Sequence, residues 1–209
     1  MDVPKTLENP VSVPVSDPSA PPAPLPEGPL RTPRLLLRPW READIPAILA
    51  ICQDPEIQRW TTVPSPYRLE HAQWFVREFT PKGFTSGDEA TFGVFVAETG
   101  EIAAAVGLGG LTRHGAGRGV RTAEIGYWAN PATRGRGYVT EAVREVIRWG
   151  FAELGVQRVF WQACDGNDAS RRVIEKLGFT MVGLQRNSHE HRGQLVGMWL
   201  ADILPGELR

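Results

Sequence analysis

The stretch from residue 123 to residue 164 restricts the fold of this chain more than any other part. Within it, Tyr138–Leu154 carries apolar side chains at steps of three and four residues, which predicts an amphipathic helix with one buried stripe. Gly155 follows the stripe, where a glycine commonly ends a helix. Apolar runs at Ala123–Ala129 and Arg158–Cys164 predict strands on both sides of this helix. A strand, a helix and a strand in this order predict a sheet covered by helices.

The rest of the chain continues this alternation. Helical spacing of apolar residues appears at Glu42–Cys52, Leu69–Phe79 and Asp168–Leu177. Strand patterns appear at Leu35–Leu37, Thr91–Ala97, Ile102–Leu111, Phe179–Gly183 and Leu195–Leu200. Loops are predicted at Asp54–Arg68, which holds three prolines, and at Arg113–Arg121, which holds three glycines. The element order βααβββαβαββ predicts an α/β protein.

The first 30 residues differ from the rest, because nine of the 18 prolines lie there. Proline removes a backbone donor and restricts φ, so this segment cannot form a helix or a central strand. We therefore expect a disordered, Pro-rich tail over residues 1–30 and one folded domain over residues 31–209. A role for the tail as a ligand for a partner protein stays open.

Composition excludes several classes of protein. The formal net charge is −1 and the pI is about 6.4, which argues against a nucleic-acid or membrane-surface binder. No apolar run approaches the ~20 residues of a membrane-spanning helix, and the start does not resemble a signal peptide. Two cysteines, Cys52 and Cys164, are too few for a disulfide framework. We therefore expect a cytoplasmic protein with free thiols.

A glycine-rich turn, Asn130–Tyr138, joins the predicted strand to the predicted long helix. Gly135 and Gly137 leave no side chain over the backbone, and the first four N–H groups of a helix have no internal partner. Such a turn binds phosphate groups, and Arg134 and Arg136 would add charged donors. An ordinary strand-to-helix turn with exposed arginines is the alternative.

Other common sites do not fit this sequence. It has no Gly-x-x-x-x-Gly-Lys-Ser/Thr motif, which excludes a P-loop nucleotide site. The glycines of residues 107–110 lack the spacing and the following helix of a dinucleotide site. His189 and His191 have no further ligands nearby in the sequence, so we expect no metal.

Four motifs, in this order along the chain, resemble the GNAT superfamily of acetyltransferases. They are Ala123–Trp128, Arg134–Ala142, Asn167–Ser170 and Glu175–Phe179. The opening Arg31–Arg38 is similar to the Rim-type branch, which acetylates the N-termini of ribosomal proteins. The resemblance runs from about Arg31 to Leu204. It implies a GNAT fold, with a mixed, mostly antiparallel twisted sheet that is splayed at the acetyl-CoA site and flanked by helices.

The resemblance also implies a binding site for acetyl-CoA. Trp128 and Ala129 would offer backbone groups to the pantetheine arm, and Asn167 and Ser170 would face that arm and the thiol. The pyrophosphate would be wrapped by the loop residues Arg134, Gly135, Arg136, Gly137, Tyr138, Val139 and Thr140.

The chain departs from the family pattern at two positions. Ala132 stands where the family pattern has Gln or Arg, so that contact is absent or comes from Arg134. Ile174 stands where many members have a tyrosine general acid, which shifts the role of proton donor to Ser170. The alternative for Ser170 is a hydroxyl that satisfies backbone N–H groups in the first turn of its helix.

Acetyl transfer to an amine requires that the amine be neutral when it attacks. Glu124 is the candidate base, acting directly or through water, and we expect burial to raise its pKa. The alternative is a structural carboxylate paired with Arg121 or another loop arginine.

The expected function is therefore transfer of acetyl from acetyl-CoA to a primary amine, in the first instance a protein or peptide N-terminus. A small amine such as an antibiotic is an alternative acceptor, and a non-catalytic acyl-CoA sensor is a second alternative function. No nucleic-acid or membrane partner is expected. The oligomeric state is left open, with a homodimer as one option.

Overall fold

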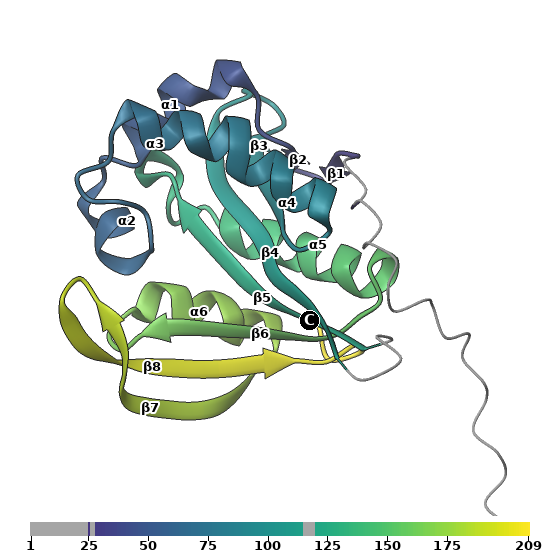
Figure 1. Cartoon of the computed structure of the whole chain (residues 1–209). Coiled ribbons are helices and arrows are strands. Elements are labelled where there is room, and N and C mark those ends of the chain that lie inside the picture. The colour runs from purple at the N-terminus through teal and green to yellow at the C-terminus, as the bar shows by residue number, and fades with distance from the viewer. Residues whose placement is uncertain (1–24, 26–27, 115–119) are drawn as a thin grey trace, which may run out of the picture.

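The computed structural model describes residue 25 and the ranges 28–114 and 120–209. Within them, eight strands form one sheet in the order β1-β2-β3-β4-β5-β6-β8-β7 (Figure 1). The strands are β1 (Leu30–Arg31), β2 (Leu35–Arg38), β3 (Ala90–Val96), β4 (Ile102–His114), β5 (Val120–Ala129), β6 (Val156–Cys164), β7 (Thr180–His191) and β8 (Gln194–Ile203). All neighbours run antiparallel except β5 and β6, which are parallel. The predicted mixed, mostly antiparallel sheet is thus confirmed.

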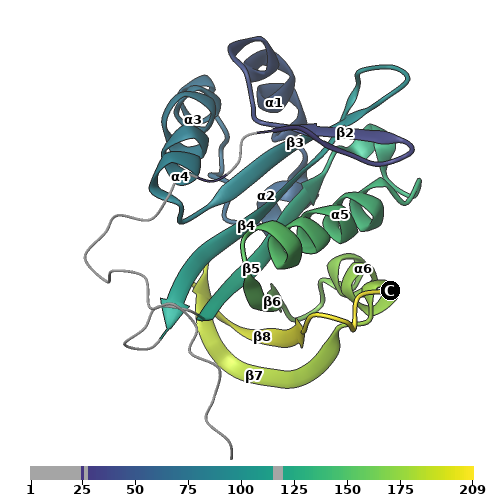
Figure 2. The ribbon, with the colours of Figure 1, turned by 90° about the vertical axis from the view of Figure 1, so that its right-hand side faces the viewer.

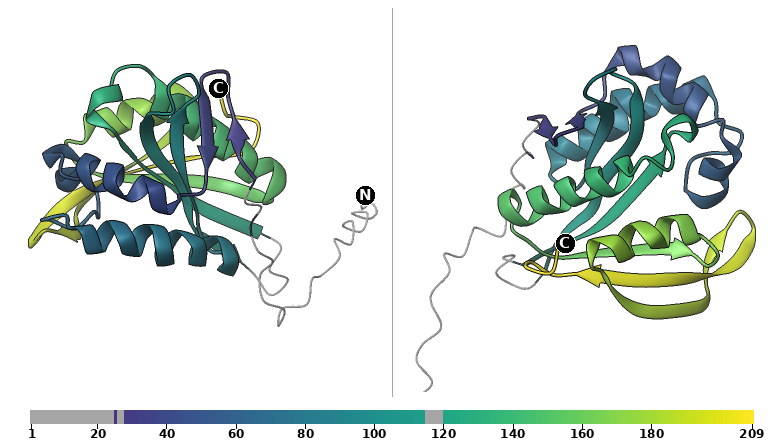
Figure 3. Two further views of the ribbon diagram at one scale, coloured as in Figure 1. Left: turned by 90° about the horizontal axis from the view of Figure 1, so that it is seen from above. Right: turned by 180° about the vertical axis from the view of Figure 1, so that it is seen from behind.

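Helices lie on both faces of this sheet. They are α1 (Ile45–Ile51), α2 (Pro55–Trp60), α3 (Leu69–Trp74), α4 (Thr80–Ser86), α5 (Tyr138–Glu153) and α6 (Asp168–Leu177). A π-helical stretch, Phe75–Phe79, joins α3 to α4. Helix α5 packs on one face and α1 and α3 on the other, as Figures 2 and 3 show. No helix among the described residues is long and apolar enough to cross a membrane.

The apolar stripe of α5 forms the centre of the larger core. Val143 and Val146 are fully buried there, together with Ile125 of β5. Burying each such side chain contributes roughly 1.5–3 kcal/mol to folding. Gly150 allows α5 to approach β4, because a Cβ at this position would lie 2.6 Å from Leu108 Cδ1. The helix predicted at Tyr138–Leu154 therefore forms, with its last residue as the C-cap.

Several elements differ from the sequence-based expectation, among them helix α4 and strand β1, which were not predicted. The stretch predicted as a loop over Asp54–Arg68 contains helix α2, because Asp54 Oδ1 accepts the Ile57 N–H at 2.9 Å and Pro55 occupies the first turn. The two last strands are longer than predicted and meet at a hairpin turn. Arg192 and Gly193 have positive φ in that turn, and the polar stretch on either side pairs through its backbone without needing an apolar pattern.

The predicted tail lies mostly outside the described residues, as does the centre of the predicted loop, residues 115–119. Leu25 is described and is 4% exposed, with its N–H donated to the Phe84 carbonyl at 2.9 Å. Strand β1 starts at Leu30 and pairs with β2. Leu25 and Leu30, which were both predicted to belong to the tail, thus contact the folded domain.

Candidate functional site

Strands β5 and β6 separate partway along their length. Their ladder starts at Arg121 and Val156 and ends at the pair Glu124 and Phe160. Beyond it, β5 continues to Ala129 paired only with β4, and β6 continues paired only with β8. Figure 1 shows the two strands diverging. One edge of β5 therefore has no strand partner among the described residues, and such an edge accepts an extended chain of amide groups.

The turn after β5 is fastened to β4 by buried polar side chains. Asn130 Nδ2 donates to the Ile102 carbonyl at 2.7 Å, while its Oδ1 accepts the Ala132 N–H at 3.1 Å. Thr133 Oγ1 donates to the Ala103 carbonyl at 3.0 Å. These contacts fix the path of the backbone into α5. The sequence analysis did not single out either side chain, although an Asn before a Pro is a turn signal.

The glycine-rich turn then enters α5 through two left-handed residues. Gly135 and Gly137 both have φ of +78°, a conformation that side chains disfavour. Gly137 is the N-cap of α5, and no side chain caps the helix there. Glu141, in the first turn, is directed instead to Thr32 and Arg34, which lie 2.5 Å and 2.7 Å from its carboxylate oxygens. The N–H groups at this end of α5 are therefore free of a side-chain cap and suited to an anion.

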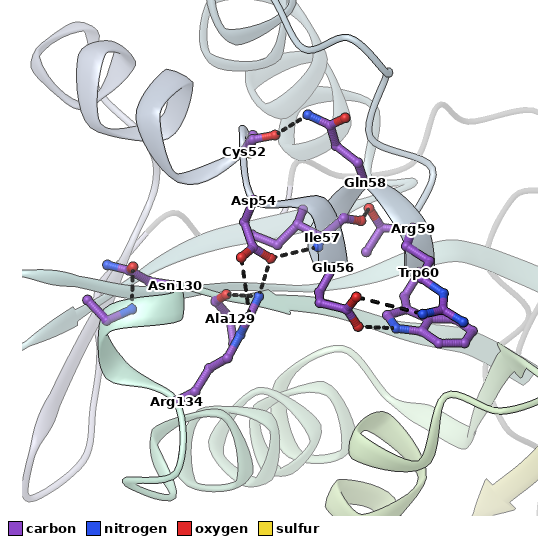
Figure 4. Close-up of polar contacts among 12 residues, drawn as sticks. Cys52, Asp54, Glu56, Ile57, Gln58, Arg59, Trp60, Ala129, Asn130 and Arg134 are labelled. Carbon is purple, nitrogen blue, oxygen red and sulfur yellow. Dashed lines mark hydrogen bonds and ion pairs between the residues drawn. The ribbon is translucent and has the colours of Figure 1, made fainter.

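The two arginines of the turn differ in their contacts. Arg134 Nη2 lies 2.6 Å from Asp54 Oδ1 and 3.3 Å from the Ala129 carbonyl, as Figure 4 shows. The backbone carbonyl of Arg136 accepts a hydrogen bond from Arg34 Nη1 at 3.1 Å, and the side chain of Arg136 is exposed. The turn thus presents one exposed arginine and one that is paired.

Glu124 occupies the last position at which β5 is paired with β6. Burial raises the pKa of its carboxyl group, against the opposing effects of a hydrogen bond from Gln162 and the charge of His189. This is the direction that the sequence analysis predicted. A carboxylate with a raised pKa is a better proton acceptor near neutral pH than an ordinary glutamate.

A second carboxylate, missed by the sequence analysis, lies beside Glu124. Gly109 is directly opposite Glu124 in the β4–β5 ladder, and a Cβ built on Gly109 would lie 3.6 Å from Glu89 Oε1. Burial raises the pKa of Glu89, the charge of Glu124 raises it further, and a hydrogen bond from Thr91 opposes both. No motif marks Glu89, because only the strand register brings it here.

Ser170 joins the two diverging strands. Its Oγ accepts from Trp161 Nε1 at 3.0 Å and donates to the Tyr127 hydroxyl at 2.8 Å, and that hydroxyl donates to the Ser170 carbonyl at 3.0 Å. Asn167 is the N-cap of α6 and accepts the Ser170 N–H at 3.2 Å. The alternative in which the Ser170 hydroxyl satisfies backbone N–H groups is therefore wrong, since it bonds only side chains. Tyr127 and Trp161 were not predicted as site residues.

The predicted base and proton donor lie on opposite sides of the sheet. Successive side chains of a strand alternate between faces, so Glu124 and Tyr127, three residues apart, point to opposite faces. Ser170 contacts Tyr127 and shares its side. Trp128 is half-buried and stacks on Trp40, with ring centroids 6.0 Å apart. Glu124, Trp128 and Ser170 thus lie along the stretch where β5 and β6 separate, and the glycine-rich turn follows the end of β5. No group of three metal-ligating side chains occurs among the described residues.

Comparison with known proteins gives consistent results. Residues 34–180 match the acetyltransferase (GNAT) domain family. The uncharacterized N-acetyltransferase YoaA of Bacillus subtilis (strain 168) is 28% identical over 157 residues, 75% of this chain and 85% of YoaA. Mycobacterium smegmatis RimJ in complex with CoA-disulfide has a TM-score of 0.73 at 25% identity, covering 86% of this chain and 87% of RimJ. RimL, a ribosomal L7/L12 alpha-N-protein acetyltransferase in complex with coenzyme A, shares the fold, with a TM-score of 0.75 at 16% identity over 85% of this chain and 98% of RimL.

Proposed function

Because this chain belongs to the GNAT acetyltransferase family, we propose that it acetylates the N-terminal amine of a protein or peptide. The chain is an acetyl-CoA-dependent N-acetyltransferase, and acetyl-CoA is its cosubstrate. The observation that carries the finer proposal is the end of the β5–β6 ladder at Glu124. The open edge of β5 begins at this carboxylate and leads along the strand to the turn that enters the uncapped N-terminus of α5.

The described residues fit acetyl-CoA as a ligand. In this proposal the free edge of β5 at Trp128 and Ala129 pairs with the amide groups of the pantetheine arm. The N–H groups of Arg134–Thr140 hold the diphosphate, since two glycines at φ of +78° turn this backbone without side chains in the way. Asn167 and Ser170 lie near the thiol end. The exposed Arg136 adds a positive charge.

Glu124 is proposed to remove the proton from the attacking amine. An N-terminal amine has a pKa of about 7.7–8.0 and is already roughly a tenth neutral at pH 7. A lysine side chain, with a pKa of about 10.4, would need on the order of 3–4 kcal/mol more help. A carboxylate with a raised pKa, as Glu124 has, is matched to the easier of these two tasks.

Ser170 is proposed to supply the proton to the leaving sulfur from the other side of the sheet. Its hydroxyl receives the Trp161 N–H and donates to Tyr127, so the oxygen is held in place. Burial raises the pKa of Tyr127, although its bonds to Ser170 and Trp161 act in the opposite direction, so the Tyr127 hydroxyl keeps its proton. Once Ser170 has given its proton to the sulfur, Tyr127 can turn to donate a hydrogen bond to the serine oxygen. The cycle closes when Ser170 takes a proton from solvent and Glu124 releases to solvent the proton it removed from the amine.

The choice of a protein N-terminus as acceptor follows from two further considerations. RimL, which shares the fold, acetylates the α-amine of a ribosomal protein. The start of the chain also carries the Arg31–Arg38 pattern similar to the Rim-type branch. A small-molecule amine remains the competing acceptor, and the experiment below separates the two.

The test measures thiol release from acetyl-CoA with matched peptide acceptors. One peptide has a free N-terminus and no lysine, its partner has a blocked N-terminus and one lysine, and a panel of small amines completes the set. We expect turnover with the first peptide, with the acetyl group located on the α-amine by mass spectrometry. Turnover only with small amines, or only with the blocked peptide, would overturn the proposed acceptor.

Glu124→Gln should retain coenzyme A binding and lose turnover, and unchanged turnover would remove Glu124 as the base.

A further inference from the structure

Helix α2, which the sequence analysis predicted as a loop, is attached at its N-terminal end to the proposed diphosphate turn. Asp54 Oδ1 accepts the Ile57 N–H at 2.9 Å as the helix cap and also lies 2.6 Å from Arg134 Nη2 (Figure 4). Burial acts to raise the pKa of Asp54, but the bonds from Arg134 and the Ile57 N–H outweigh it and hold the pKa below its usual value. Asp54 is therefore charged at neutral pH and pairs with a side chain of the turn.

The C-terminal end of α2 is attached to the turn between β7 and β8. The last carbonyls of a helix lack internal partners and favour cationic donors. Arg192 Nη2 donates to the carbonyls of Gln58 and Val63, the latter at 2.9 Å. His191 Nε2 lies 2.7 Å from the Arg59 carbonyl. The β7–β8 hairpin thus caps the C-terminal end of α2.

An aromatic ring at the end of α2 lies against the turn after β6. Trp60, at the end of α2, lies so that a Cβ on Gly166 would be 3.5 Å from its Cη2. Gly166 belongs to the turn between β6 and α6. The Trp60 Nε1 donates to Glu56 Oε2 at 2.8 Å, which orients the ring from within α2. Helix α2 therefore contacts the turn after β5, the turn after β6 and the β7–β8 hairpin, and it spans the opening between β5 and β6.

The two partners available to Arg134 compete. A guanidinium forms its strongest bonds with anions, and in this structure Asp54 is that anion. A diphosphate at the adjacent N–H groups carries more negative charge than one carboxylate. We propose that Asp54 is a positioning residue that holds Arg134 against α2 until the diphosphate takes Arg134 from it. This exchange releases the N-terminal end of α2 and opens the way for the acceptor amine to reach Glu124.

This inference rests on the proposed function for the place of the diphosphate. It adds a direction of coupling, because binding at the turn after β5 loosens a helix that contacts the β7–β8 hairpin. The acceptor then gains access after the cosubstrate is bound. By reciprocity, an acceptor that displaces α2 would raise the affinity for the cosubstrate by the same factor.

Hydrogen exchange of the full chain with and without coenzyme A tests this proposal. In the wild type, coenzyme A should slow exchange in residues 134–140 and accelerate it in residues 55–63 and at the hairpin turn. Asp54→Asn keeps a side chain that caps helices but removes the charge that holds Arg134. It should bind coenzyme A about three- to tenfold more tightly, with α2 already exchanging fast and no longer responding to the ligand. Glu56→Gln is the matched control, because it removes a charge from the same helix without touching Arg134 and keeps an amide oxygen that can accept the Trp60 N–H. It should respond like the wild type.

The outcomes separate this inference from the proposed function. Slowed exchange at residues 134–140 with no change in α2 would overturn the coupling and leave the coenzyme A site intact. Weaker coenzyme A binding by Asp54→Asn would also overturn it, since that result means Asp54 holds Arg134 in its binding position. The absence of any coenzyme A binding by the wild type would instead contradict the proposed site itself.

Discussion

Removing the Asn130 side chain should destabilise the protein and weaken its hold on acetyl-CoA together. Asn130 is 9% exposed and makes two side-chain hydrogen bonds, a donation to the Ile102 carbonyl at 2.7 Å and an acceptance from the Ala132 N–H at 3.1 Å. In Asn130→Ala the Ile102 carbonyl loses this donor, which costs about 1–2 kcal/mol. Loss of the turn bond to Ala132, which lies nearer the surface, adds about 0.5–1 kcal/mol.

Together they predict a loss of about 1.5–3 kcal/mol in the free energy of unfolding. For a domain of this size each kcal/mol lowers Tm by about 2–4 °C, so Tm should fall by about 3–12 °C. Urea unfolding gives the free energy directly, provided that the m-value is unchanged. Calorimetry with coenzyme A should show weaker binding, because the same two bonds fix the backbone that leads to Gly135.

Ala132→Ser is the control for this prediction. Ala132 is exposed and lies two residues after Asn130, and its substitution leaves both hydrogen bonds in place because only its backbone N–H takes part. The urea midpoint of unfolding and the coenzyme A affinity of Ala132→Ser should match those of the wild type. The reasoning is refuted if Asn130→Ala unfolds at the wild-type urea concentration, because that result would mean that the Ile102 carbonyl finds another donor without cost. A loss of stability with unchanged coenzyme A affinity would mean that the two Asn130 hydrogen bonds stabilise the fold without shaping the binding site.

Three further predictions concern single side chains. Glu124→Gln should lower kcat by about a hundredfold or more. In the wild type, kcat/KM should fall at low pH as Glu124 is protonated, at a pH above the usual range of a glutamate because its pKa is raised, and this fall should be absent in the variant. Ser170→Ala leaves the Trp161 N–H without its partner, so we expect a loss of about 1–3 kcal/mol in urea unfolding together with slower turnover at unchanged coenzyme A affinity. Hydrogen bonds from Arg34 and a neighbouring hydroxyl outweigh burial and lower the pKa of Glu141, so its contribution is present at neutral pH and lost as the pH falls through the folded-state pKa. Glu141→Gln should therefore be about 1 kcal/mol less stable at pH 7, a small value because Arg34 is half exposed, and the two unfolding curves should converge in acid.

Local patterns in the sequence were sufficient for the long helix and the strands beside it. The stripe of Tyr138–Leu154 has a period that only a helix buries on one side, and Gly135 and Gly137 mark a turn that needs positive φ. The resemblance to the GNAT superfamily added the splayed sheet, and the end of the β5–β6 ladder at Glu124 agrees with it.

Short elements with mixed signals were harder to predict. Helix α2 contains only six residues, and the prolines on either side of its sequence suggested a loop. Its capping signal, an Asp followed by Pro and Glu, was present in the chain but was outweighed by composition. The ends of β7 and β8 were missed for a related reason, because a two-stranded polar ribbon holds together by backbone bonds that leave no periodic apolar pattern.

The sequence by itself determined the long helix, the strands on either side of it, where the turn into α5 lies and which residue types surround that turn, because these depend on neighbours a few positions apart. Tertiary structure alone decided the partners of those residues. Glu89 reaches Glu124 only through the β4–β5 register, and Asp54 meets Arg134 only because α2 packs over the end of β5. Contacts between residues tens of positions apart depend on how the sheet closes, and no periodicity along the chain records that.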